Sequence, residues 1–507
     1  MKKSSESVRE MHGYFWWLGE ETPEGRFAPT TAVPGTLMIS EDGLAKLTLT
    51  GSLIQSSFLQ LDTATKRHAD MHLDALAGKT IVGKVDDDMR CVYLQQVVYQ
   101  EGGRTLDHRL LENYRAAICL VGESTTPLPP DAFTFSRLSI ELTGLEEWRR
   151  HDALRVDAAK TEGERQSQVV SYTAEQWEYG IDEGSVSLRT DVHCTALHDI
   201  GTQKISFEQH DWIDYAPSTS QSPEELKQEF GYIEELLALL SGSYYALKWP
   251  QISTNRSSRV DAYTLYFHRR TEKLPPPEAW ELWTFFPQVR DSFGTIYGNW
   301  RKKRREHGAG FYLHLAALRN SSMYVEHRFV NLVWGIESLH RSLFPLAKGP
   351  SSDKAIIKSL LTNLAEHLKP KQAKWLEKQF ERSTEPTLQD RIVETFKTLP
   401  WQIEIKTLRE FAKRCQDRRN DISHFGGPRK EKNESYEVFL QDLIQLSAAL
   451  SRLYHAALLK EIGVEDPTVR STLFDMPVNF RIRQEFERVG LSIPKRPEPA
   501  TPPARAR

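Results

Sequence analysis

Cysteine is scarce in this 507-residue chain: there are four, far apart, and none stands in a CxxC pair. This spacing argues against a zinc ribbon and against a disulfide framework, and it fits a reducing compartment. Long apolar runs are also missing, because no stretch approaches the roughly 18 residues that a membrane-spanning helix requires. The early GYFWWLG segment is too short for a signal sequence. We therefore expect a cytoplasmic protein without a membrane segment.

The chain has no excess of positive charge either. Its 66 Lys and Arg residues face 69 Asp and Glu, which gives a formal net charge of −3. The whole molecule is therefore not a polycation, and any contact with nucleic acid has to come from local basic patches.

Short β-strand patterns dominate the first half. Residues 36–51, TLMISEDGLAKLTLTG, carry two apolar-rich runs around Glu-Asp-Gly, which predicts a hairpin. A second hairpin is indicated around Asp182-Glu183-Gly184. Many short strands at such spacing favour a sandwich or a barrel-like domain. We expect a sandwich-like, β-rich region at residues 1–215.

The pattern becomes helical after residue 310. Apolar residues recur at three- and four-residue steps from Phe329 to Leu343 and again from Phe439 to Ala457, as in amphipathic helices of a bundle. The predicted fold is therefore α+β, with an all-α second half. The predicted parts are a β-rich region at 1–215, a mixed connecting region at 216–308, a helical bundle at 309–465 and an extension at 466–507 with a disordered, Pro-rich basic tail.

One arginine stands where the helical pattern calls for an apolar residue. The helix that leads into CQDRRNDISHFGGP has an apolar stripe containing Leu408, Ala412 and Cys415, and Arg419 falls inside that stripe. A charge at a core-facing position needs a partner or a site, since an unpaired buried charge is very costly. Glu337, on an earlier helix, is a candidate partner, with Arg341 one turn further on.

The end of the same helix predicts a polar site. Asn420 and His424 share a face at i and i+4, whereas Arg419 approaches from the core side. His424 lies in the last turn, where the helix dipole favours imidazolium. A fixed cation beside an imidazole suits phosphate chemistry. The alternatives are a surface arginine, a helix-capping histidine and a simple Glu337–Arg341 helix pair.

These residues carry a family resemblance. Arg419-Asn420-x3-His424 resembles the R-x4-6-H signature of HEPN domains, and Glu337-x3-Arg341 resembles the preceding E-x3-K element with Arg in place of Lys. FVNLVWGIESLHR, PTLQDRIVETF and RRNDISHFGG resemble the HEPN domain of ApeA-type anti-phage defence proteins. GYFWWL, PGTLMISEDGLAKLTLTG and LSIELTGLEEW are similar to the β-rich amino-terminal region of that family.

The resemblance implies a metal-independent endoribonuclease that requires no cofactor. Arg419 would hold the scissile phosphate, and His424 would serve as acid or base in attack by the ribose 2′-OH. Asn420 would keep the site polar, while Glu337 and Arg341 would order it. HEPN sites lie at two-fold dimer interfaces, so the implied partners are a second copy, an RNA such as tRNA, and a phage-derived trigger sensed by the amino-terminal region.

A dense basic run offers a second candidate surface for RNA. It comprises Trp300, Arg301, Lys302, Lys303, Arg304 and Arg305. The tryptophan could stack on a base and the cations could contact phosphates, although such a run is as often a solvated segment. We expect no metal site, because His193, Cys194 and His198 lack a second ligand pair at standard spacing.

Two other function classes stay open. The first is a non-catalytic, HEPN-like module that dimerises or binds a ligand, with the β-rich half as a recognition domain. The second is a metal-dependent nuclease.

Overall fold

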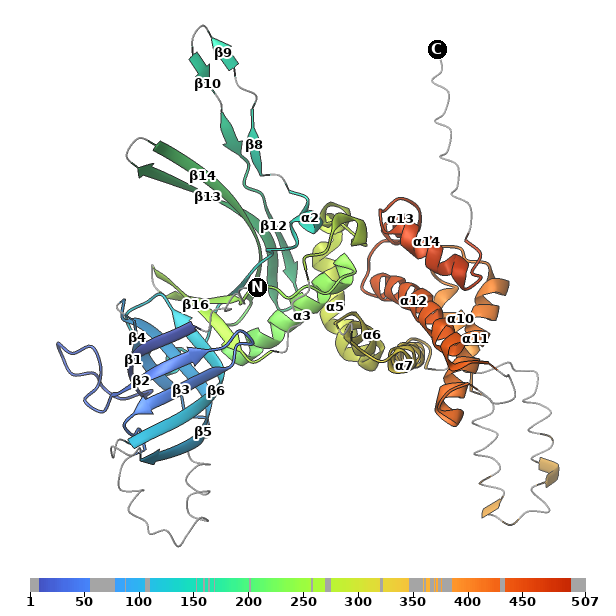
Figure 1. The fold of residues 1–507 in the computed structure, drawn as a ribbon, viewed down its shortest axis with the longest axis horizontal. Coiled ribbons are helices and arrows are strands. Elements are labelled where there is room, and N and C mark those ends of the chain that lie inside the picture. Colours follow the sequence, from blue (N-terminus) through green and yellow to red (C-terminus); the bar gives the residue numbers. More distant parts are fainter. Residues whose placement is uncertain are drawn as a thin grey trace. The chain divides into compact units, whose positions relative to one another are not determined.

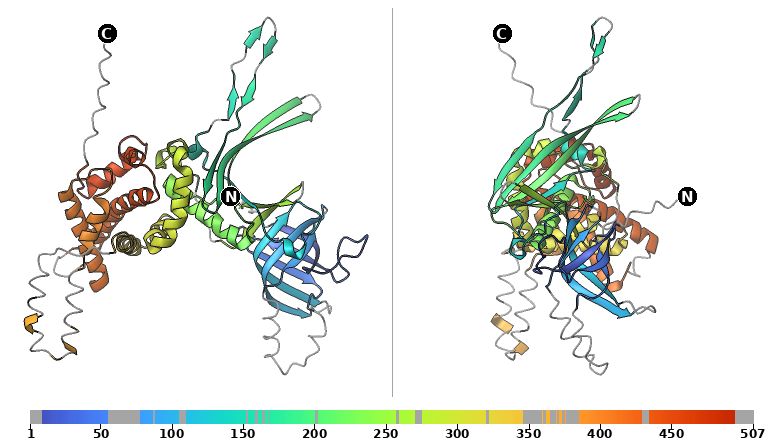
Figure 2. Two further views of the ribbon diagram at one scale, coloured as in Figure 1. Left: turned by 180° about the vertical axis from the view of Figure 1, so that it is seen from behind. Right: turned by 90° about the vertical axis from the view of Figure 1, so that its left-hand side faces the viewer.

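In the computed structural model, two compact units can be described separately (Figures 1 and 2). The first contains residues 1–146, 151–234 and 246–274, and the second contains residues 147–150, 235–245 and 275–507. The four-part division expected from the sequence stays a prediction. The described residues are 9–493 except 55–77, 87, 105–109, 152, 158–159, 163–164, 168, 200–201, 257–258, 270–274, 320–321, 346–358, 360–361, 365–368, 370, 373–374, 376–384 and 429–433. The Pro-rich tail expected to be disordered lies outside them.

Six antiparallel strands of the first unit form a closed barrel (Figure 1). They are β1 (Arg9–Trp17), β2 (Val33–Ile39), β3 (Ala45–Thr50), β4 (Ile81–Val85), β5 (Arg90–Arg104) and β6 (Leu110–Gly122). The neighbour order is β6-β3-β2-β1-β4-β5, and β5 also pairs with β6. Alternate residues point inward, as in β3, where Ala45, Leu47 and Leu49 are buried.

The sandwich-like expectation is therefore wrong for this region. The predicted hairpin at 36–51 is confirmed, with Ile39 opposite Ala45. What closes the sheet is the long β5, which runs along β6 from Val92↔Val121 to Arg104↔Leu110. A register shift between Tyr99 and Glu101 interrupts this pairing. Such bulges increase strand twist, which favours closure over two stacked layers.

The sheet continues beyond the barrel through strands that pair in the order β16-β15-β7-β14-β13-β12. They are β7 (Arg137–Glu141), β12 (Gln176–Ile181), β13 (Gly184–Asp199), β14 (Thr202–Pro217), β15 (Gln251–Arg256) and β16 (Arg259–Phe267). Two small two-stranded sheets, β8 with β11 and β9 with β10, comprise β8 (Leu154–Val156), β9 (Lys160–Glu162), β10 (Arg165–Ser167) and β11 (Val170–Tyr172). The predicted turn at 182–184 is confirmed between β12 and β13.

The long β13–β14 pair has one face that changes from buried to exposed along its length. Near its base, Leu188 and Ile213 lie opposite each other and are fully buried. Further out on the same face, Cys194 pairs with Phe207, and Ile205 follows two residues away. Ile205 is 62% exposed and Phe207 is 36% exposed. We call the outer face that carries Cys194, Ile205 and Phe207 the ribbon face.

The second unit is helical, so the predicted α+β class is confirmed at this level. Its longer helices are α5 (Phe293–His307), α6 (Ala309–Arg319), α7 (Val325–Leu343), α10 (Leu388–Phe396), α11 (Ile405–Phe425), α12 (Tyr436–Glu461), α13 (Asp466–Phe474) and α14 (Asn479–Arg488). Helix α3 (Pro223–Ser241) begins in the first unit and ends in the second. None of the helices within the described part of the chain combines the length and the apolar character needed to cross a membrane.

Helix α7 lies at the centre of this bundle and contacts α6, α10, α11 and α12. The periodicity read from the sequence is confirmed, because Phe329, Val333 and Ile336 are fully buried. On α12, Leu443 and Leu450 are fully buried as well. This core holds α7 and α11 together, and these two helices carry the candidate site.

Candidate active site

Helix α11 ends where the sequence places its polar cluster. Gly426 adopts a left-handed conformation with φ of 68°, and its N–H donates to the carbonyl oxygen of Ile422. Glycine suits this position because a Cβ is disfavoured there. Leu408 and Cys415 bury one face of the helix, so the residues that follow are fixed at its carboxyl end.

Arg418 anchors this helix end to the start of α12. Its two terminal nitrogens each donate to one carboxylate oxygen of Glu434 at 2.6 Å, and its Nε donates to Asp442 at 2.5 Å. The fully buried Asp421 lies 3.6 Å away. The hydrogen bonds with Glu434 are the largest cause of the raised pKa of Arg418. All of its nitrogens are occupied by acidic groups, so Arg418 has a structural role.

Arg419 is held more loosely. It donates to Glu337 on α7 at 3.4 Å and to the Oδ1 atom of Asn420 at 3.2 Å. The Arg419 side chain is 29% exposed, and that of Glu337 is 17% exposed. The buried Nε of Arg419 has no hydrogen-bond partner among the residues described. The guanidinium is thus oriented by two partners and keeps donors for an anion.

His424 lies in the last turn of α11 and is exposed. Its ring contacts that of Phe425 edge-on at 6.4 Å. Within the described parts of the chain, no side chain or backbone group forms a hydrogen bond with its ring. The imidazole is therefore accessible to an incoming ligand.

The structure brings Glu337, Arg419 and Asn420 together, and it leaves Arg341 apart from them. Arg341 is 60% exposed and lies 3.6 Å from Glu385. Within the ranges that the structure describes, it forms no ion pair with Glu337. Of the two residues of the E-x3-R element, Glu337 thus contacts Arg419, and Arg341 pairs with Glu385 instead.

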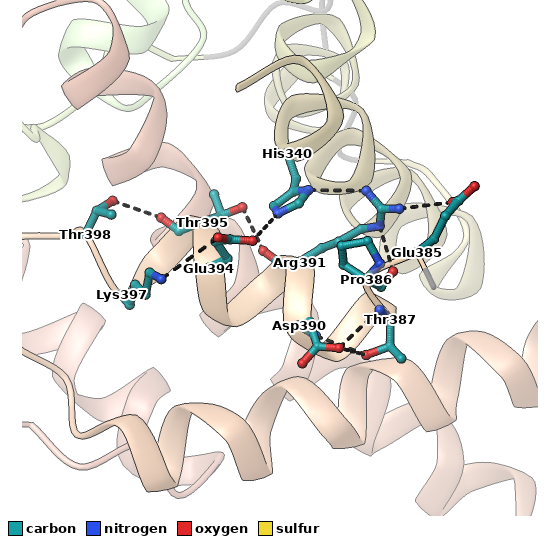
Figure 3. Close-up of polar contacts among 10 residues, drawn as sticks. All are labelled: His340, Glu385, Pro386, Thr387, Asp390, Arg391, Glu394, Thr395, Lys397 and Thr398. Carbon is teal, nitrogen blue, oxygen red and sulfur yellow. Dashed lines mark hydrogen bonds and ion pairs between the residues drawn. The ribbon is translucent and has the colours of Figure 1, made fainter. Parts of the chain in front are cut away.

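A buried polar cluster fixes the end of α7 against α10 (Figure 3). His340 is fully buried; its Nε2 lies 2.9 Å from Glu394, and its Nδ1 lies 3.2 Å from Arg391. Because Arg391 can only donate, Nδ1 of His340 accepts and Nε2 carries the proton. Arg391 also contacts Glu385 at 3.3 Å. Burial lowers the pKa of His340, so this cluster favours the neutral ring one turn from Glu337.

Part of the helical unit matches a known family domain. The model of the Apea-like HEPN domain matches residues 330–468, which contain Glu337, Arg419 and His424. The model of the ApeA N-terminal domain 1 matches residues 10–300, more than half of the chain. The chain belongs to the ApeA family. Among curated proteins and among solved structures, the comparisons find no match.

Membership in the ApeA family confirms the resemblance and identifies a HEPN-type defence protein. It places the candidate site within the HEPN domain of this ApeA protein. The residues that sequence reasoning missed are Arg418 and Arg391. Arg418 binds Glu434, just before α12, and Asp442 on α12, and Arg391 donates to His340 on α7. No spacing rule identifies partners on another helix.

The basic run of this ApeA protein is part of α5. Trp300 is fully buried, with its ring 5.4 Å from that of Phe311, so stacking of Trp300 on a base is corrected to a role in the core. Arg304 donates to Glu235 at 2.5 Å. Of the remaining members, Lys302 pairs with Glu306 at 3.9 Å, Lys303 pairs with Glu461 at 3.6 Å, and Arg305 donates to the carbonyl oxygen of Arg301 at 3.1 Å. Trp300 and Arg304 therefore have structural roles, whereas Lys302 and Arg305 are exposed, and an RNA contact by these cations stays a prediction.

Proposed function

We propose that this ApeA-family protein is a metal-independent endoribonuclease that acts in anti-phage defence, with RNA as its substrate and tRNA as one candidate. The observation that carries the proposal is the partly exposed Arg419 guanidinium, oriented by Glu337 and Asn420 at the helix end that also bears His424. HEPN domains are generally ribonuclease domains, which supports the same activity.

Arg419 would bind the scissile phosphate. A guanidinium presents pairs of N–H donors that match two phosphate oxygens, and charge-assisted hydrogen bonds of this kind are strong. Glu337 pairs with one terminal nitrogen of the guanidinium at 3.4 Å and would orient it. The remaining donors would meet the extra charge that develops on the phosphate oxygens in the transition state.

His424 would transfer protons. In the proposed step the ribose 2′-oxygen attacks phosphorus and loses its proton to a base. The bond from phosphorus to the 5′-oxygen breaks, and that oxygen receives a proton from an acid. The products are a 2′,3′-cyclic phosphate and a free 5′-hydroxyl. A neutral imidazole can accept the first proton, and an imidazolium can donate the second.

One histidine cannot perform both transfers in a single concerted step. A second copy of the chain, related by a two-fold axis, would place its own His424 near the same phosphate. We therefore propose a homodimer through the HEPN domains, in which each site uses both chains.

Substitution of His424 by glutamine tests this assignment. We expect cleavage to fall by about 100- to 10,000-fold, the usual contribution of acid–base catalysis. The readout is single-turnover cleavage of total tRNA by the activated full-length protein, with and without excess EDTA. End analysis of the products should find 2′,3′-cyclic phosphates, and EDTA should leave the rate unchanged.

Each alternative function has its own signature in that experiment. Cleavage that survives His424→Gln would eliminate the catalytic role, and activity lost in EDTA would restore the metal-dependent nuclease. Full protection of infected cells by the His424→Gln protein would instead favour a non-catalytic module. Sequencing of RNA ends from infected cells, compared between the unchanged protein and the Arg419→Ala variant, would identify the target.

We propose further that the β-rich unit senses a phage-derived protein through the ribbon face. Ile205 and Phe207 are exposed apolar residues on the same side as the buried Leu188 and Ile213. A two-stranded ribbon is marginally stable alone, and contiguous exposed apolar side chains are typical of interaction sites. The polar residues of the opposite face, such as Ser206 and Glu208, supply a matched control.

The double substitution Ile205→Ser and Phe207→Ser should abolish protection against phage while leaving the amount of protein unchanged. The expected plating efficiency equals that of cells without the protein, because loss of the apolar contacts would prevent detection. The control pair Ser206→Ala and Glu208→Ser should keep protection. A ribbon-face variant that protects normally would exclude this surface as the sensor.

A further inference from the structure

A groove lies directly beside the candidate site, between the beginning of α7 and the end of α11. It has a volume of about 690 Å³ and is lined by Ser322, Met323, Tyr324, His327, Val330, Asn331, Trp334, Ile422 and Ser423. None of these residues is acidic. The aromatic rings are accessible: Tyr324 is 78% exposed and Trp334 is 51% exposed.

On both helices, residues that line the groove lie about one helical turn from the Arg419–Glu337 pair. Trp334 precedes Glu337 by three residues on α7, and Ile422 follows Arg419 by three on α11. At 1.5 Å of rise per residue, three residues correspond to about 4.5 Å along each axis. A nucleotide next to a phosphate on Arg419 would therefore reach the groove.

We infer that this groove binds an unstacked nucleobase next to the scissile phosphate, so that the enzyme selects single-stranded or looped RNA over continuous duplex. The inference rests on the proposed function. Aromatic faces stack on any base, and sequence-specific and single-strand RNA sites commonly use them. His327 lies edge-on to Tyr324, with ring centroids 5.9 Å apart. Asn331 and Ser423 add polar groups for the edge of the base.

A base enclosed in a duplex cannot enter this groove, because both of its faces are stacked and its pairing edge is used. Pulling it out costs a few kcal/mol. A loop or a single strand presents its bases without that cost. The groove therefore gives a physical reason for selection by RNA conformation.

The test measures binding separately from cleavage. The probe is a fluorescein-labelled, single-stranded RNA 12-mer in which every 2′-oxygen is methylated, so that it cannot attack phosphorus. Fluorescence anisotropy gives its Kd with the full-length protein. Trp334→Ala and Tyr324→Ala should each weaken binding by about 10- to 100-fold, the range of one lost base–aromatic stack. Trp334→Phe should weaken it by less than about 5-fold, since a ring remains.

The matched control is Trp280→Ala, which removes another tryptophan of the same unit that is 48% exposed and lies outside the groove lining. Its Kd should stay at the unchanged value. The same probe annealed to its complement should bind more weakly than the single strand and should not respond to Trp334→Ala.

Equal Kd values for the unchanged protein and both alanine variants would overturn the inference. So would a change from dimer to monomer in Trp334→Ala by light scattering, which would assign the groove to contact between two copies. The proposed nuclease function fails differently: an unmodified RNA would remain uncut by the protein while the anisotropy results stood as expected.

Discussion

Arg419→Ala is expected to reduce RNA cleavage by about 100- to 1,000-fold, the cost of removing one donor that stabilises a developing oxyanion. Arg419 is only half-buried and contributes a single long ion pair with Glu337, 3.4 Å in length. Such a pair adds on the order of 1 kcal/mol or less to the free energy of unfolding. The variant should therefore fold normally and lose activity. Single-turnover cleavage and a thermal unfolding curve of the same preparation measure both quantities.

Two further variants make the result specific. Lys413→Ala removes another cation from the same helix, one that is 52% exposed and pairs only with Asp417 among the described residues, and its cleavage rate should be unchanged. Arg419→Lys keeps the charge and loses the paired donors, so its rate should lie between those of the alanine variant and the unchanged protein. An Arg419→Ala protein that cleaves at the normal rate would contradict the proposed phosphate contact.

Local sequence patterns predicted the elements well. The turn residues at 41–43 and at 182–184 lie within hairpins, and the apolar repeat of α7 is buried as expected. Each of these signals depends on residues that are close in sequence. Closure of the barrel depends on how far β5 runs along β6. No residue pattern in either strand distinguishes that pairing from a layered sandwich, so the sandwich-like prediction was wrong.

In the candidate site, too, the sequence predicted features that depend on nearby residues and did not predict contacts between distant ones. The helical wheel identified Arg419 as a charge on an apolar stripe, and the structure finds it beside Glu337, 82 positions earlier. The sequence pattern made Glu337 a candidate partner, but it could not show that the two side chains are in contact. For Trp300 the charged neighbours suggested a surface, yet burial of its large apolar ring determined its place in the core. The charge of neighbouring residues in the sequence is therefore a poor guide to the burial of a side chain on a helix with one buried and one charged face.

Arg418→Ala, unlike Arg419→Ala, should greatly reduce the stability of the protein. The change removes the bidentate cation of Glu434 and one of the two arginines that bind Asp442. It also removes a cation that lies 3.6 Å from the fully buried Asp421. Breaking a buried ion pair by removing one partner typically costs about 3 to 5 kcal/mol. The contact of Arg418 with the Phe439 ring, at 5.0 Å, would be lost too.

Hydrogen–deuterium exchange can measure this loss at the helices concerned. Peptides from the end of α11 and the start of α12 should exchange much faster in Arg418→Ala, while barrel peptides of the first unit should not change. Arg414→Ala is the control, because Arg414 is 43% exposed and shares only Asp442 with Arg418; its effect should be small. If Arg418→Ala exchanged normally and still abolished cleavage, the phosphate contact would belong to Arg418. We therefore expect Arg418, which lies beside three carboxylates, to stabilise the fold. We expect Arg419, which pairs with a single distant carboxylate, to act in RNA cleavage.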